Sequence, residues 1–91
     1  NNAVIVDESA DLKKAIPSIV FGAVGTAGQR CTTTRRVLVH HSRYHDLLRG
    51  LLSAYSQIKM GDPLEANTLL GPLIDAAACD HFVSTLREVA A

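Results

Sequence analysis

One strand–helix–strand pattern occupies residues 3–40, whose sequence is AVIVDESADLKKAIPSIVFGAVGTAGQRCTTTRRVLVH. Residues 3–6 are an apolar run rich in β-branched side chains, which is typical of a parallel strand covered on both faces. Residues 37–40 form a second strand-like run. Between the two runs, apolar residues recur at helical spacing over residues 12–24, which predicts a helix of about three to four turns. The pattern predicts a βαβ unit with parallel strands and a right-handed crossover.

The details of this unit depend on a proline, a glycine and a polar segment. Pro17 lies inside the predicted helix, where it lacks a backbone N–H and is expected to kink the helix or delay its start. Gly25 is expected to cap the C-terminal end of that helix. Residues 25–36 are polar and short-sided, without sustained periodicity. They predict a loop that carries Cys31 into the second strand.

The second half of the sequence predicts two further helices, capped at their starts by Ser42 and Asp75. The first has an apolar stripe of Tyr44, Leu47, Leu48, Leu51, Leu52, Tyr55 and Ile58. The second has an apolar stripe of Cys79, Phe82, Val83, Leu86 and either Val89 or Ala90. The predicted fold class is therefore α/β, a βαβ unit followed by two helices. A two-stranded sheet is small for an independent domain, and the sequence starts on a strand-like run without methionine, so residues 1–91 are expected to be a piece of a larger domain.

Composition limits the classes of function. The 91 residues are 47% hydrophobic and carry nine basic and nine acidic side chains, which predicts one small globular unit without a field that would attract nucleic acid or an anionic membrane. No stretch approaches the ~20 apolar residues of a membrane span, and residues 1–3 do not begin a signal peptide. Two cysteines are too few for a disulfide scaffold. These features predict a soluble protein of a reducing, cytoplasmic compartment.

Cys31 is the candidate catalytic residue. It stands in the polar loop between Arg30 and Thr32, where a thiol has room to meet a ligand. A neighbouring guanidinium favours the thiolate, which is the nucleophilic form. Small residues let backbone amides approach a reacting carbonyl, so the amide of Cys31 can help to stabilise an oxyanion. The alternative interpretation is a small, buried, unreactive thiol.

Two other classes of function stay open at this stage. Cys79 falls on an apolar helical stripe, where packing in a core is the expected role. Together with Cys31 it could form a redox-sensing pair, although nothing in the spacing places the two thiols within disulfide distance. The remaining class is a structural domain that interacts through its helices. Reactivity distinguishes the three, because an enzyme segment needs one accessible nucleophilic thiol, a redox switch needs a reversible disulfide, and an interaction domain needs neither.

No metal, nucleic-acid or nucleotide motif is recognised. The four histidines, His40, His41, His45 and His81, have no Cys-x-x-Cys or His-Glu-x-x-His pattern among them, so no metal is expected. Arg35 and Arg36 are not extended into a basic patch. Gly25 and Gly28 lack the further glycine and lysine positions of nucleotide-binding loops, so no cofactor-binding residue is expected.

The run Phe21–Arg35 resembles the cysteine segment of the aldehyde dehydrogenase superfamily, through Gly28-Gln29-x-Cys31 followed by an arginine at position 35. Residues 61–63, Gly-Asp-Pro, and residues 71–74, Gly-Pro-Leu-Ile, are similar to later stretches of that family at suitable spacing. Residues 1–3, Asn-Asn-Ala, resemble the end of its Glu-Leu-Gly-Gly motif, and the sequence is closest to the antiquitin-like branch, which oxidises α-aminoadipic semialdehyde. The glutamate of that motif would precede residue 1, and Glu8 does not match it.

The resemblance implies a fragment of a catalytic domain, residues 1–91, that supplies the nucleophile, with the dinucleotide-binding domain elsewhere. The implied reaction is NAD- or NADP-dependent oxidation of a small-molecule aldehyde through a Cys31 thiohemiacetal and thioester. Arg30 and Thr32, beside the nucleophile, are the implied substrate-binding residues. The full-length enzyme is expected to be a homo-oligomer. The fragment alone is expected to bind no cofactor and to be inactive.

Overall fold

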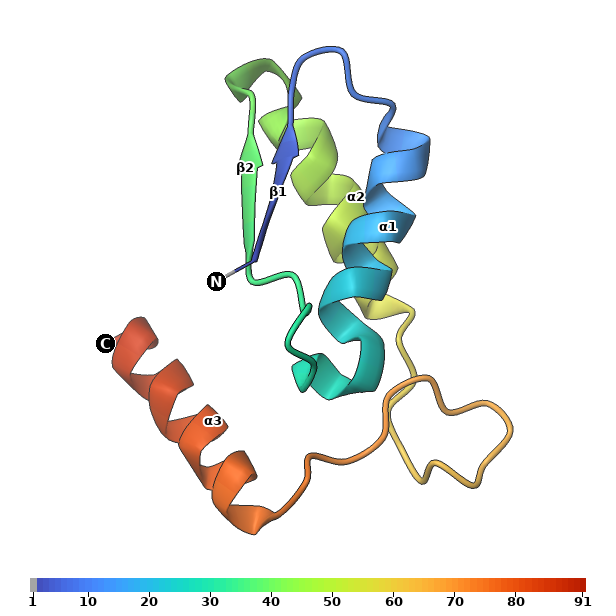
Figure 1. Ribbon diagram of the computed structural model, residues 1–91, viewed down its shortest axis with the longest axis vertical. Helices are drawn as coiled ribbons and strands as arrows, with labels where there is room; N and C mark the ends of the chain where they lie inside the picture. The colour runs from blue at the N-terminus through green and yellow to red at the C-terminus, as the bar shows by residue number, and fades with distance from the viewer. Residues whose placement is uncertain (1) are drawn as a thin grey trace.

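The computed structural model of the chain describes residues 2–91 and contains a small parallel sheet. Strands β1 (Ala3–Val6) and β2 (Arg36–Val39) pair from Ala3 with Arg36 to Val6 with Val39. Helix α1 (Leu12–Val24) and the 3₁₀ turn η1 (Gly25–Gly28) connect them (Figure 1). This confirms the predicted βαβ unit. Strand β2 begins one residue earlier than predicted because Arg36 pairs with β1.

Helices α1 and α2 (Tyr44–Ser56) cover the same face of the sheet (Figure 1). The core between these layers contains Val6, Ile19 and Leu47, each at most 3% exposed. Gly50 allows the two helices to approach, because a Cβ atom there would overlap the Ile16 side chain. The opposite face of the sheet is open, and Ile5 on it is 78% exposed. The prediction that the first strand is covered on both faces is therefore wrong for the described residues, since both packed helices lie on one face.

Helix α1 begins at Leu12, so Pro17 does not delay its start, which was one of the two predicted effects. The side chain of Asp11 accepts a hydrogen bond from the Lys13 N–H at 3.0 Å and caps the first turn. Pro17 lies on the exposed side of the helix, where water can satisfy the carbonyl that loses its usual partner. Gly25 is the C-terminal cap, as predicted, and its N–H donates to the Phe21 carbonyl.

The second helix starts differently from the prediction. Ser42 lies inside a 3₁₀ turn, η2 (His41–Arg43), and its hydroxyl pairs with His40 Nδ1 at 2.8 Å instead of capping α2. Arg43 donates to the Ala10 carbonyl at 2.5 Å, which ties this turn to the start of α1. Ile58 falls after the end of α2.

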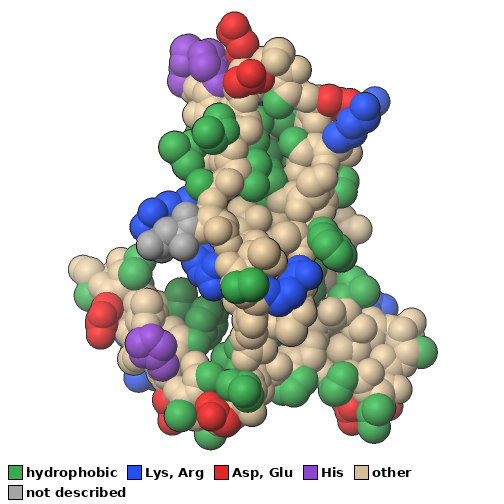
Figure 2. Space-filling model, in the orientation of Figure 1, with side chains coloured by type: hydrophobic (Ala, Val, Ile, Leu, Met, Phe, Trp, Pro, Cys, Tyr) green, Lys and Arg blue, Asp and Glu red, His purple; other side chains and the backbone are tan. Residues whose placement is uncertain are grey.

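Helix α3 (Ala76–Ala90) begins at the predicted cap, where Asp75 Oδ1 accepts the Ala78 N–H at 2.8 Å. None of its residues is buried, and it stands apart from the layer of β1, β2, α1 and α2 (Figure 1). Figure 2 shows a hollow between this helix and the rest of the molecule, with hydrophobic side chains around it. Cys79 is exposed. The expectation that Cys79 packs in a core is wrong within the described residues, because no element packs against that stripe.

Candidate functional site

Cys31 lies in a tight turn, residues 30–33, which residues 34 and 35 connect to β2. The Thr33 N–H donates to the Arg30 carbonyl at 3.1 Å, and the Arg30 N–H donates to Thr33 Oγ1 at 3.1 Å. Thr33 is only 5% exposed, whereas Cys31 and Thr32 are exposed. The buried side chain of Thr33 thus anchors the turn, and the thiol stands at an accessible position rather than in the core.

The backbone before this turn is left-handed, where sequence analysis predicted only an irregular loop. Thr26 and Ala27 have φ values of 55° and 53°, and Gly28 follows at 72°. Left-handed backbone costs about 1–2 kcal/mol at each residue other than glycine. The backbone N–H and the side-chain Nε2 of Gln29 each donate a hydrogen bond to the Thr26 carbonyl at 3.1 Å, and these bonds help to hold this conformation.

After the left-handed residues 26–28, the chain turns back and runs beside the end of α1. The Thr34 N–H donates to the Gly22 carbonyl at 2.9 Å. Glycine is needed at position 22 because a Cβ atom there would lie 2.7 Å from Thr34 Oγ1. Helix α1 therefore fixes both ends of the segment that carries Cys31.

Gln29 connects the loop to a segment far along the chain. Its Oε1 accepts the N–H of Ile74 at 2.8 Å, across 45 residues of sequence. The sequence marked Gln29 only as part of Gly28-Gln29-x-Cys31, without a partner. The structure shows that this side chain joins the residues 71–74 stretch to the cysteine loop.

Arg30 points toward the end of α1. Its Nη2 donates to the Phe21 carbonyl at 3.3 Å, and its guanidinium carbon lies 5.5 Å from the centroid of the Phe21 ring. These contacts stabilise the loop. The structure therefore gives the three predicted site residues different surroundings: Cys31 and Thr32 are exposed on the turn, and Arg30 is engaged with α1.

Side chains outside the turn bind its carbonyl groups. Asn2 donates to the Cys31 carbonyl, and Arg35 donates to the carbonyls of Arg30 and Thr33. By contrast, the backbone N–H groups of Cys31 and Thr32 have no acceptor among residues 2–91. Unpaired amides beside an accessible thiol are the donors that an oxyanion next to the sulfur would need.

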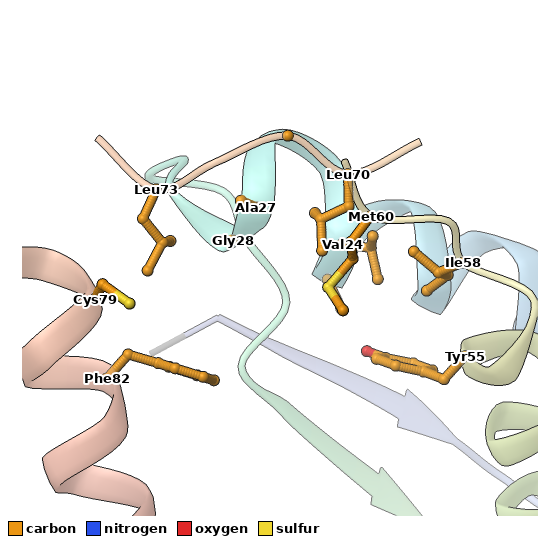
Figure 3. Close-up of a pocket in the computed structure, with 12 residues that line it drawn as sticks. Val24, Ala27, Gly28, Tyr55, Ile58, Met60, Leu70, Leu73, Cys79 and Phe82 are labelled. Atoms are coloured by element: carbon orange, nitrogen blue, oxygen red, sulfur yellow. The ribbon is translucent and has the colours of Figure 1, made fainter. Parts of the chain in front are cut away.

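An apolar pocket of about 590 Å³ lies between α3 and the βαβ unit (Figure 3). Its walls are Ala23, Val24, Ala27, Gly28, Tyr55, Ile58, Met60, Leu70, Gly71, Leu73, Cys79 and Phe82. Cys31 is not among them. Figure 3 shows Cys79 and Phe82 on one wall and Tyr55 and Ile58 on the other. Apart from Tyr55 and Cys79, none of these lining residues has a side chain that transfers protons, and the candidate nucleophile Cys31 lies on the turn outside this pocket.

The remaining titratable groups do not assemble a second site. Among residues 2–91, no three histidine, cysteine, aspartate or glutamate side chains come together as metal ligands. Both cysteines are free thiols. The Ser9 hydroxyl and N–H, which donate to Asp7, lower the pKa of that carboxyl, but Asp7 follows the opposite end of β1 from the cysteine turn. None of the helices within the described part of the chain is long and apolar enough to cross a membrane.

The profile of the aldehyde dehydrogenase family matches residues 1–91. Aldehyde dehydrogenase family 7 member A1 of Brassica napus is 60% identical over 89 residues, which are 98% of this chain and 18% of that protein. Alpha-aminoadipic semialdehyde dehydrogenase of Mus musculus is 50% identical over 97% of this chain and 16% of its own length. The chain therefore spans less than a fifth of these relatives.

Solved structures show the same arrangement. Proline utilization A from Bdellovibrio bacteriovorus superposes with a TM-score of 0.95 at 30% identity, over 98% of this chain and 9% of that one. Betaine aldehyde dehydrogenase from Staphylococcus aureus, in complex with NAD+, superposes with a TM-score of 0.91 at 28% identity, over 94% of this chain and 17% of that one. The βαβ unit and its following helices are thus similar to segments of much longer chains.

Proposed function

The chain belongs to the aldehyde dehydrogenase family, and we propose that the full-length protein containing it oxidises an aldehyde to a carboxylic acid with NAD or NADP. Within that protein, residues 1–91 form part of the nucleophile-bearing catalytic domain, and the dinucleotide-binding domain lies elsewhere in the sequence. The observation that carries the proposal is the accessible Cys31, which follows Gly28-Gln29 on a turn with unpaired amides. An exposed thiol beside free N–H donors can add to a carbonyl group.

Cys31 carries the covalent step in this proposal. Its thiolate sulfur forms a bond to the aldehyde carbon, and the carbonyl π electrons move to oxygen as an alkoxide. The N–H groups of Cys31 and Thr32 are the donors within reach of the turn that can stabilise this charge. Covalent capture fixes the substrate carbon in one position for the oxidation that follows.

The nicotinamide cofactor is assigned by this proposal to residues outside this chain. The glycine-rich turn of a dinucleotide-binding motif leads into the start of a helix, where backbone N–H groups meet the phosphates. The glycine-containing turn η1 instead follows the C-terminal end of α1, and Thr26 and Ala27 in it are left-handed. We assign the cofactor to the remainder of the full-length protein, and only the thiol step to this chain.

The proposed substrate is an acidic semialdehyde, because one relative at 50% identity is an alpha-aminoadipic semialdehyde dehydrogenase. Arg30 and Thr32 flank the thiol and are the proposed substrate-binding residues. Arg30 would meet a substrate carboxylate by exchanging its bond to the Phe21 carbonyl for a charge-assisted one.

A cytoplasmic homo-oligomer is proposed for the full-length enzyme. The two free thiols fit a reducing compartment. The exposed apolar residues of α3, which include Phe82 at 56% and Leu86 at 52% exposed, fit burial against further protein.

The test is a pair of matched substitutions in the full-length protein. Cys31→Ser should abolish aldehyde oxidation while cofactor binding persists, because a hydroxyl is a far weaker nucleophile at neutral pH. Cys79→Ser, which changes the only other thiol in the sequence, should retain turnover. Turnover that survives in Cys31→Ser and disappears in Cys79→Ser would exclude Cys31 as the nucleophile.

A further inference from the structure

Asn2 makes a contact that nothing in the sequence indicates. Its side-chain Nδ2 donates to the Cys31 carbonyl at 2.6 Å and to the Thr33 carbonyl at 3.4 Å, across about thirty residues of sequence. A primary amide has two N–H donors, so one Asn2 side chain can serve both carbonyls. These bonds connect the residue preceding β1 directly to the backbone of the candidate nucleophile.

Arg35 completes the same set of contacts from the other side of the turn. Its Nη1 donates to the Thr33 carbonyl at 3.0 Å, and its Nη2 donates to the Arg30 carbonyl at 3.3 Å. The backbone carbonyl of Asn2 in turn accepts the N–H groups of Arg35 and Arg36, at 3.0 and 3.2 Å. Asn2 and Arg35 therefore hold each other in place and bind three carbonyls of the turn between them.

Binding the carbonyls also orients the amides. A trans peptide is planar, and its C=O and N–H point in opposite directions. The described chain has no cis peptide bond. When Asn2 holds the Cys31 carbonyl, the Thr32 N–H of the same peptide points away from Asn2. The Arg30 carbonyl and the Cys31 N–H likewise belong to one peptide. Because Arg35 holds that carbonyl, the direction of the Cys31 N–H is also fixed.

We propose that Asn2 is a positioning residue for the aldehyde-oxidising reaction: it fixes the Cys31–Thr32 peptide and thereby aims the thiol and the free Thr32 N–H at the substrate. This inference rests on the proposed function of Cys31. Asn2 does not touch the reacting atoms. It acts through the carbonyl of Cys31, with Arg35 as its partner.

Asn2→Asp and Asn2→Ala in the full-length protein test this role. Aspartate has nearly the shape of asparagine, but its ionised carboxylate only accepts hydrogen bonds, and it would face the carbonyl oxygens of Cys31 and Thr33. Asn2→Ala should lower kcat about 2- to 10-fold, the equivalent of one net hydrogen bond. Asn2→Asp should lower kcat further, with the cofactor KM unchanged. Asn67→Asp, the same change at an exposed position outside the turn, should keep the wild-type kcat.

The dependence on pH separates positioning from general damage to the fold. A protonated carboxyl regains an O–H donor. The two carbonyl oxygens that face this carboxyl disfavour its charged form and should raise its pKa above the ordinary value of about 3.9. The ratio of Asn2→Asp to wild-type kcat should therefore rise as the pH falls from 8 to 5. Alkylation of Cys31 by iodoacetamide, followed by peptide mass spectrometry, should show the same trend, whereas Cys79 should react equally in both proteins.

Three outcomes decide the inference. Wild-type kcat and alkylation rates in both Asn2 variants would overturn it, and so would a loss of kcat in Asn2→Asp that is equal at pH 5 and pH 8. If Cys31→Ser is inactive in the same assay, either of these two results rejects the positioning role of Asn2 and leaves the proposed function of Cys31 intact. If Cys31→Ser is active, the proposed function itself fails, and this inference fails with it.

Discussion

The packing of α2 on the βαβ unit predicts opposite consequences for two leucines of the same helix. Leu47 is 3% exposed and lies against Val6 and Ile19, whereas Leu52 is 63% exposed. Complete burial of a leucine side chain contributes about 1.5–3 kcal/mol, and the cavity left by Leu→Ala raises the total cost to about 2–5 kcal/mol. Leu52 retains roughly a third of that burial, so its truncation should cost about 0.5–1 kcal/mol.

The expected cost of Leu47→Ala is large compared with the free energy of unfolding of so small a chain. A complete domain of this length would have a free energy of unfolding of about 5–14 kcal/mol at the ordinary value per residue, and a piece with three buried core residues should have less. Leu47→Ala should therefore remove a large part of the stability of the 91-residue chain, or unfold it outright. Urea unfolding followed by circular dichroism at 222 nm measures both variants against the unsubstituted chain. Equal shifts of the two midpoints, or a larger shift for Leu52→Ala, would refute the assignment of the core.

Two further predictions concern the site. In the full-length protein, Arg30→Ala should lower kcat/KM more for acidic semialdehydes than for neutral aliphatic aldehydes, because only the acidic substrates lose a charge-assisted hydrogen bond; equal losses would assign Arg30 solely to its contact with the Phe21 carbonyl. The 91-residue chain alone should reduce neither NAD nor NADP in the presence of aldehyde, as followed by absorbance of the reduced cofactor, and sustained turnover that disappears in Cys31→Ser would show that it holds a complete site.

Local patterns in the sequence were sufficient to predict the βαβ unit. Three predictions depend only on residues that are close together in the sequence, and the structure confirms all three. They are the strands from the β-branched runs, the helix from the spacing over residues 12–24, and the Asp75 cap. Within residues 2–91, β1 is covered on one face only, whereas its apolar composition predicted cover on both. Composition indicates which surroundings suit a strand, and the elements that actually pack on it depend on the path of the chain. The actual cover depends on α1 and α2, which both lie on one face.

The site was predictable only in part. The polar segment indicated that Cys31 would be accessible, and its residue types suggested a nucleophile. The contacts of Asn2 with Cys31 and of Gln29 with Ile74 join residues far apart in sequence, so they depend on the path of the whole chain. The left-handed turn was missed because Thr26 and Ala27 are not residues that ordinarily adopt positive φ.

The proposal that Cys31 is the nucleophile can be tested by trapping its covalent intermediate. The full-length protein is mixed with aldehyde and cofactor, quenched in acid during turnover, digested and analysed by mass spectrometry. We expect the peptide containing Cys31 to gain the mass of the substrate acyl group, the peptide containing Cys79 to remain unmodified, and the modification to be lost in Cys31→Ser. Acylation of Cys79, or undiminished turnover by Cys31→Ser, would contradict the proposal.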